Sequence, residues 1–193
     1  MDLLRLNLLD KRRIQDFEHL LSGKEFNGCY CAAWTNFDET WDERCKTRPQ
    51  ENFEHTRNRV AARQHVGYLV IRDSDGAVVA WTGSGPKTSF PRLKERPGSR
   101  TGPFDASVWS IGCLAIGRSY RGLHYSRQIV EHLVEEAKRA GAKTIEAYPI
   151  EPSGDDNASR GSKAMYEALG FTVAAQEQEG TVSYLRMEKT LQG

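Results

Sequence analysis

One segment near the middle of the chain constrains the fold more than any other. Residues 108–116 form a nearly continuous apolar run, which predicts a strand buried on both faces of a sheet. A turn rich in arginine and glycine follows at 117–126, and residues 126–140 carry the periodic apolar stripe of an amphipathic helix. Such a turn points free backbone amides and the positive end of the helix dipole toward an anion. It is therefore a candidate phosphate or pyrophosphate site. The alternative is an ordinary connection with solvated arginines.

The remaining elements surround this centre. The patterning predicts strands at 3–8, 66–72, 77–83, 144–150, 171–176 and 183–188, and helices at 11–21, 49–64 and 160–169. Asp10 is expected to cap the first helix, and an Asp-Gly turn joins the second and third strands as a hairpin. Residues 26–48 show no regular pattern, and residues 84–105 form a long, locally basic loop. We expect one mixed α/β domain over residues 1–193.

Composition excludes several classes of function. Lys and Arg number 27 against 26 for Asp and Glu, a balance that argues against a nucleic-acid partner. No apolar run approaches the roughly 20 residues that span a bilayer, so no membrane partner is expected. The first residues lack the features of a signal peptide, so we expect a cytoplasmic location with reduced cysteines. Cys29 and Cys31 with the distant Cys45 lack the spacing of a zinc site, so we expect no metal.

Two motifs make the reading more specific. Arg121-Gly122-x-His124-x-Ser126 resembles the acetyl-CoA motif of the GNAT N-acetyltransferase superfamily, which reads Gln/Arg-x-x-Gly-x-Gly/Ala. Tyr166-x-x-x-Gly-Phe, further along the chain, is similar to the superfamily's Tyr-x-x-x-Gly-Phe ending. The segments Cys-Tyr-Cys-x-x-Trp at 29–34 and Val-Trp-Ser-Ile-x-Cys at 108–113 resemble a bacterial branch of these proteins. The resemblance implies a mixed, mostly antiparallel sheet with a central splayed strand pair and helices on both faces.

The resemblance also implies acetyl-CoA as the acetyl donor. Its pantetheine arm would pair with the central strand at Leu114, Ala115 and Ile116. The pyrophosphate would lie on the amides of Arg121, Gly122, Leu123, His124, Tyr125 and Ser126. Ser159 stands where many members have an Asn that contributes to the cofactor site. His124 replaces a glycine, so its β-carbon is expected to crowd the pyrophosphate or shift it, whereas the small Ser126 could also cap the helix.

The implied reaction is direct transfer of the acetyl group to an amine in a ternary complex. Tyr166 resembles the superfamily's general acid, which protonates the departing thiolate; the alternative is a core residue before a helix end. A backbone amide near Leu114 or Ala115 is expected to polarise the carbonyl. Glu146 is the best carboxylate for a general base acting through water; the alternative is a solvated or salt-bridged group. Cys113 as a covalent relay is a further alternative to an inert packing thiol.

The acceptor is expected to be a small molecule with a primary amine. Tyr30, Trp34 and Trp81 are expected to line its pocket. Two alternatives stay open: an enzyme that acetylates protein lysines or N-termini, which needs an open groove, and a non-catalytic acyl-CoA-binding or sensing domain. Because dimers are common in the superfamily, a homodimer is one of the expected oligomeric states.

Overall fold

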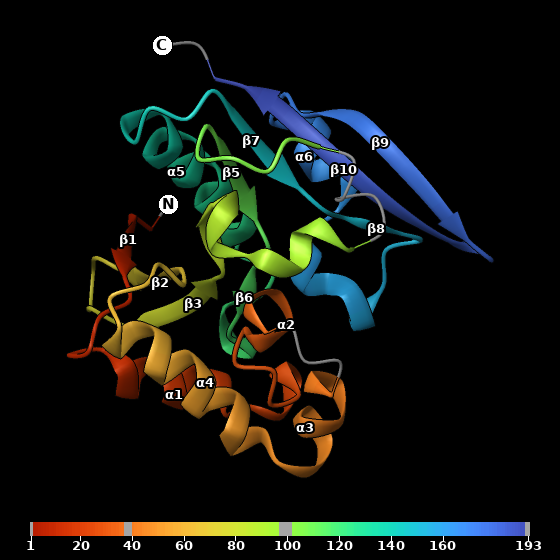
Figure 1. The fold of residues 1–193 in the computed structure, drawn as a ribbon. Helices are drawn as coiled ribbons and strands as arrows, with labels where there is room; N and C mark the ends of the chain where they lie inside the picture. Colours follow the sequence, from red (N-terminus) through yellow and green to blue (C-terminus); the bar gives the residue numbers. More distant parts are fainter. Residues whose placement is uncertain (1, 37–39, 97–101, 192–193) are drawn as a thin grey trace.

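The computed structural model describes residues 2–36, 40–96 and 102–191, without the side chains of 155–157. Two sheets form its centre (Figure 1). The first has the order β1 (Leu4–Leu8), β2 (Tyr68–Arg72), β3 (Val78–Thr82) and β6 (Ala115–Ile116). The second has the order β4 (Ser84–Pro86), β5 (Val108–Ile111), β7 (Thr144–Ala147), β10 (Val182–Thr190) and β8 (Ile150–Glu151), with β9 (Thr172–Glu179) on β10.

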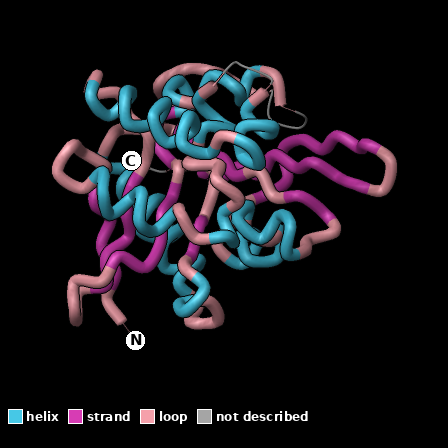
Figure 2. Tube along the Cα trace, turned by 90° about the horizontal axis from the view of Figure 1, so that it is seen from below, coloured by secondary structure: helices cyan, strands magenta, loops and turns pink. Residues whose placement is uncertain are grey.

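Six α-helices accompany the sheets in the described part of the chain: α1 (Ile14–Leu21), α2 (Ala32–Thr35), α3 (Trp41–Thr47), α4 (Pro49–Ala61), α5 (Tyr125–Arg139) and α6 (Lys163–Ala168). Short 3-10 turns are η1 (Lys24–Phe26), η2 (Lys87–Ser89), η3 (Pro91–Lys94), η4 (Arg118–Tyr120) and η5 (Asp155–Arg160). In Figure 1, α1, α3 and α4 group at one end of the molecule, whereas α5 lies beside β5 and β7. The β9–β10 hairpin extends away from the rest of the molecule (Figure 2).

Strand β2 shows why helices cover both faces of the sheet. Alternate side chains of a strand point to opposite faces. Tyr68 and Val70 belong to one buried cluster, which also contains the apolar stripe of α5. Leu69, between them, belongs to a second cluster with the buried residues of α1 and α4. Apart from the parallel pair β5–β7, the strand pairs are antiparallel. The predicted mixed, mostly antiparallel architecture is therefore confirmed.

The central strand is interrupted, and this interruption positions the site. The pattern predicted one strand over 108–116, but β5 ends at Ile111 and β6 begins at Ala115. The parallel pairing of β5 with β7 ends at Ile111 and Ala147. Beyond it, β6 pairs with β3 and β8 pairs with β10, so the two central strands diverge into different sheets. This divergence confirms the predicted splayed strand pair.

A close approach of backbones explains the interruption. The Gly112 amide donates to the carbonyl oxygen of Gly83 at 2.9 Å. A β-carbon at Gly112 would lie 2.7 Å from that oxygen and 3.1 Å from Nε1 of Trp34. A residue with a side chain would therefore push the strand away from both neighbours.

Several predicted boundaries were wrong for local reasons. Asp10 accepts the Arg12 amide at 2.8 Å and stabilises a turn, so the first helix begins later, at Ile14. Ser126 does not cap α5, because the N-cap position belongs to His124. The sixth helix begins at Lys163 instead of residue 160. Its N-cap residue is Ser162, whose hydroxyl accepts the amide of Met165 at 3.2 Å.

The two segments without a clear pattern contain regular structure. Residues 26–48 include α2 and α3, and the segment 84–105 includes β4, η2 and η3. Part of each segment lies outside the described residues. Both contain short elements of three to seven residues. Such elements are too short for a periodic pattern, and tertiary contacts determine them.

Candidate active site

The backbone amides beside the strand break point in two directions. The Gly117 amide donates to the Val79 carbonyl of β3 at 3.0 Å. Amides alternate along a strand, so the Ala115 amide also faces β3, whereas that of Leu114 faces the gap between the diverging strands. There the Leu114 amide donates to the carbonyl oxygen of Ser159 at 2.6 Å. Of the two amides expected to polarise a carbonyl, one therefore faces the sheet and the other already has an acceptor.

The turn before α5 is shaped for an anion. Gly122 has a φ of +79°, and a β-carbon there would meet no atom within 4 Å. His124 adopts a left-handed conformation at φ +59° and is the N-cap residue, with no side-chain cap on the helix. Within the described chain, the amides of residues 122–126 have no hydrogen-bond acceptor. The turn therefore presents open backbone donors at the N-terminus of a helix of 15 residues.

Other predicted residues of this turn have defined positions. The Arg121 side chain lies back against the strand, because its Nε donates to the Ile116 carbonyl at 3.3 Å. Leu123 is exposed. Tyr125 is buried, and its hydroxyl hydrogen-bonds Asp2. The turn is thus anchored on both sides, while its middle stays accessible.

A small cavity lies beside Trp34, the residue that approaches Gly112 in the strand break. Its lining comprises Trp34, Arg96, Tyr148, Pro149, Ile150, Arg160, Tyr184 and Leu185. The guanidinium of Arg160 lies 4.2 Å from the centre of the Trp34 ring, and that of Arg96 lies 5.0 Å from it. The cavity has room for about one water molecule. A larger ligand must therefore move the side chains that fill it.

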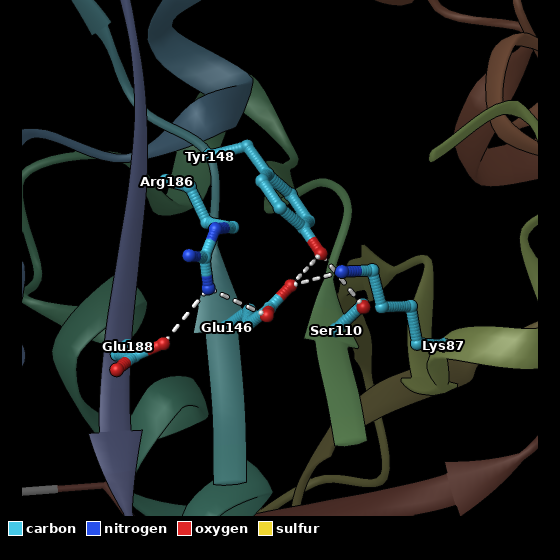
Figure 3. A network of polar contacts seen from close by, with 6 residues as sticks. All are labelled: Lys87, Ser110, Glu146, Tyr148, Arg186 and Glu188. Atoms are coloured by element: carbon cyan, nitrogen blue, oxygen red, sulfur yellow. Dashed lines mark hydrogen bonds and ion pairs between the residues drawn. The ribbon is translucent and has the colours of Figure 1, made fainter. Parts of the chain in front are cut away.

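Glu146 is not placed as a general base. It is fully buried, and its carboxylate accepts from Lys87 at 2.7 Å, from Tyr148 at 2.7 Å and from Arg186 at 3.0 Å (Figure 3). Each oxygen already binds a cation, so a proton taken from an amine would have to displace one. A β-carbon at Gly102 would lie 2.8 Å from Glu146 Oε1, so the loop also closes over the carboxylate. Glu146 is therefore a salt-bridged group, which was the alternative that the sequence left open.

The network around Glu146 connects several elements. Lys87 comes from η2, Ser110 from β5 and Arg186 from β10 (Figure 3). The Tyr148 hydroxyl lies 2.9 Å from Ser110 Oγ, and burial raises the pKa of Tyr148 well above its ordinary value. These contacts fix the end of β7 next to the cavity. Their role is to position Tyr148, which also faces Trp34 at a ring-centre distance of 6.0 Å.

Tyr166 lies near Cys113 of the strand break, because that thiol contributes, after burial, to the raised pKa of the phenol. Its side chain is fully buried on α6, with the ring edge against Phe171 at 5.3 Å between centres. Its hydroxyl donates to the Arg160 carbonyl at 3.0 Å. Burial raises the pKa of Tyr166, with a further contribution from Cys113. The phenol is therefore protonated at neutral pH, and its proton is held in the hydrogen bond to the Arg160 carbonyl.

The cysteines form pairs around the same region. Cys113 lies in the strand break, with its Sγ 3.8 Å from that of Cys31, and it accepts the Gly83 amide at 3.3 Å. A hydrogen bond from the Cys45 thiol, with help from backbone amides, lowers the pKa of Cys29 to about 6. No group of three or more His, Cys, Asp or Glu among the described residues could hold a metal ion.

Of the three predicted pocket aromatics, one lines the cavity. Trp34 does so, as stated above. Tyr30 and Trp81 instead pack in the cluster around Phe17, at ring-centre distances of 6.0 and 4.6 Å from it. Sequence reasoning named Arg96 only as part of the basic loop 84–105, and it missed Arg160 as a lining residue. The one available signal was the position of Arg160, directly after Ser159.

Comparison with known proteins identifies the family. The model of the acetyltransferase (GNAT) family matches residues 26–171. The chain belongs to this family. A GNAT acetyltransferase is an acyltransferase that takes its acetyl group from acetyl-CoA, so enzyme class and donor are confirmed. Among curated proteins, nothing matches the chain.

Solved structures share the GNAT fold at low sequence identity. The aminoglycoside acetyltransferase AAC(6')-Ib in complex with coenzyme A has a TM-score of 0.62 and 15% identity, over 97% of this chain and 95% of that chain. yncA from Salmonella typhimurium, a putative acetyltransferase with acetyl-CoA, has 0.55 and 17%, over 99% and 95%. A ribosomal-protein-alanine N-acetyltransferase from Brucella melitensis has 0.57 and 19%, over 98% and 99%.

The turn of this GNAT chain fits the donor's pyrophosphate. The open space at Gly122 lets phosphate oxygens approach the free amides of the helix start. The strand side fits after one rearrangement, because the Leu114 amide must exchange the Ser159 carbonyl for a ligand. None of the described helices has the length and apolar character needed to cross a bilayer.

Proposed function

We propose that this GNAT acetyltransferase acts on the primary amine of a small molecule, by direct transfer in a ternary complex. The cover over the strand break carries this proposal. Trp34, on the buried helix α2, lies against Gly112 and beneath the guanidinium of Arg160. An extended polypeptide acceptor needs an open groove, whereas this region is filled to the size of one water molecule. A compact acceptor that displaces a few side chains fits better.

Donor binding is assigned to the two sides of the strand break. The turn amides of Gly122, Leu123, His124, Tyr125 and Ser126 would hold the pyrophosphate. The Arg121 amide, which donates to the Arg118 carbonyl at 3.3 Å, would join them after releasing that acceptor. The pantetheine arm would lie along Leu114, Ala115 and Ile116, in the gap that Ser159 now bridges. The Leu114 amide, once released from Ser159, is the donor that faces this gap and could polarise the carbonyl.

Tyr166 is assigned as the general acid. In the transfer, the acceptor nitrogen forms a bond to the acyl carbon and the bond from that carbon to sulfur breaks. The Tyr166 hydroxyl gives its proton to the departing sulfur, and the proton lost by the nitrogen restores the phenol directly or through water. The Glu146 carboxylate already accepts hydrogen bonds from Lys87, Arg186 and Tyr148, so it does not serve as the general base. The acceptor amine must therefore arrive unprotonated.

The test is donor binding followed by turnover. Acetyl-CoA binding is measured by calorimetry, and release of free CoA is measured with a panel of small amines and with lysine-containing peptides. We expect binding and CoA release with at least one small amine. Absence of binding, or release with peptides alone, would overturn the proposal. Binding without release by any acceptor would favour an acyl-CoA sensor.

A further inference from the structure

Arg160 is a cation without an anion in the candidate acceptor cavity. Its side chain is half-buried, its guanidinium carbon lies 4.2 Å from the centre of the Trp34 ring, and it lines the cavity. Within the described residues it forms no hydrogen bond and no ion pair, and the ionisable groups facing it are thiols and Arg96. Burial, followed by the charge of Arg96, lowers the pKa of Arg160 to about 10. The group is therefore still charged at neutral pH.

A second guanidinium lies on the same ring. Arg96 lies 5.0 Å from the centre of the Trp34 ring and also lines the cavity. Elsewhere in this protein, buried cations are paired: Lys87 and Arg186 share Glu146. Arg160 differs from them because it faces a cavity, where a ligand can supply the missing charge.

We propose that Arg160, with Arg96, binds a carboxylate of the acceptor, so that the substrates are amines carrying an acidic group, such as amino acids. This inference rests on the proposed function and specifies its acceptor. The planar guanidinium has the geometry to donate hydrogen bonds to both oxygens of a carboxylate. Tyr184, whose side chain carries a hydroxyl, also lines the cavity.

The position of Arg160 relates the carboxylate site to the chemistry. Its own carbonyl oxygen accepts the hydroxyl of Tyr166, and the preceding carbonyl accepts the Leu114 amide. The anchor for the acceptor and the candidate acid are therefore connected through one residue. A carboxylate that moves Arg160 would therefore also affect the neighbouring hydrogen bond between the Leu114 amide and the Ser159 carbonyl.

The test compares matched acids and amides. In the presence of CoA, calorimetry measures the binding of N-acetyl amino acids and of the matching compounds in which an amide replaces the carboxylate. Wild-type protein is expected to bind an acid about ten- to a hundredfold more tightly than its amide, the range for a hydrogen bond to a charged group. Arg160→Gln should abolish this preference without weakening CoA binding, and Arg160→Lys should retain part of it.

A matched control is Arg139→Gln on the outer face of α5, where Arg139 pairs with Glu136 at 2.8 Å. It should retain the full preference. Equal binding of acids and amides by wild-type protein would overturn the inference without any variant. Weaker CoA binding in Arg160→Gln, with the acid preference unchanged, would also overturn it and would assign Arg160 to the donor phosphates.

Turnover distinguishes this inference from the proposed function. If free amino acid amides release CoA as fast as the acids, the carboxylate site is wrong and the proposed function stands. If no amine releases CoA but the N-acetyl acids still bind preferentially through Arg160, the carboxylate site stands and the proposed function fails.

Discussion

Replacement of Glu146 by glutamine should strongly lower the free energy of unfolding, and it should not remove a general base from the reaction. The carboxylate is buried between Lys87, Tyr148 and Arg186, with contacts of 2.7, 2.7 and 3.0 Å. A glutamine has one oxygen for these three donors, and its NH₂ group must face one of the cations. Removing one partner of a buried ion pair costs about 3–5 kcal/mol.

This cost converts to a measurable shift in melting temperature. For a domain of this length, 1 kcal/mol changes Tm by about 2–4 °C, so the expected decrease is roughly 6–20 °C. Lys87→Met should also destabilise the protein, because it leaves the buried Glu146 carboxylate without that cation. The Tm of the double variant, Glu146→Gln with Lys87→Met, should decrease by less than the sum of the two single decreases, because neither partner of the ion pair is then left alone.

The assay is thermal unfolding followed by circular dichroism, with CoA release measured well below the lower Tm. The control is Glu135→Gln, which removes an exposed pair with Lys138 at 2.9 Å and should change stability by less than about 1 kcal/mol. An unchanged Tm for Glu146→Gln, together with a loss of kcat of about a hundredfold or more, would restore Glu146 as the general base.

Three further predictions concern other residues of the site. Tyr166→Phe should lower kcat by about 10²–10⁴ while costing about 1 kcal/mol of unfolding free energy, and unchanged turnover would refute the acid role. Because its pKa is raised, Tyr166 should cause no fall in wild-type kcat up to pH 9. His124→Gly should raise stability by about 1 kcal/mol in urea unfolding, because the left-handed conformation penalises a β-carbon, and should tighten acetyl-CoA binding in calorimetry; His124→Ala should do neither. Alkylation of Cys29 by iodoacetamide should be constant above pH 7 and fall below a midpoint near 6, as its thiolate is protonated; a midpoint of about 8.5, as in ordinary thiols, would contradict the lowered pKa.

The cofactor turn could be predicted from sequence because its determinants are local. The apolar run, Gly122 and the helix stripe lie in one continuous segment, and the structure places the turn at the start of α5. The interruption at Gly112 could not be predicted. It depends on Gly83, which lies between β3 and β4, and on Trp34 from a distant helix.

Glu146 and Tyr148 show the limit of a linear pattern. Strand alternation places Glu146 on the opposite face of β7 from Ile145, but it does not show what that face meets. Lys87 and Arg186 lie 59 and 40 residues away in the chain. A carboxylate that is a candidate base in sequence is therefore a closed ion-pair centre in space.

The sequence by itself determined the family, the order of elements and the strand–turn–helix unit that suits a pyrophosphate. These properties depend on hydrophobic periodicity and on neighbouring residues, which local physics controls. The tertiary structure alone decided that Glu146 is occupied, that Tyr30 and Trp81 belong to the core, and that Arg160 faces a cavity. Whether a charged or aromatic side chain is free or satisfied depends on partners from distant segments, and packing of the whole chain brings these together.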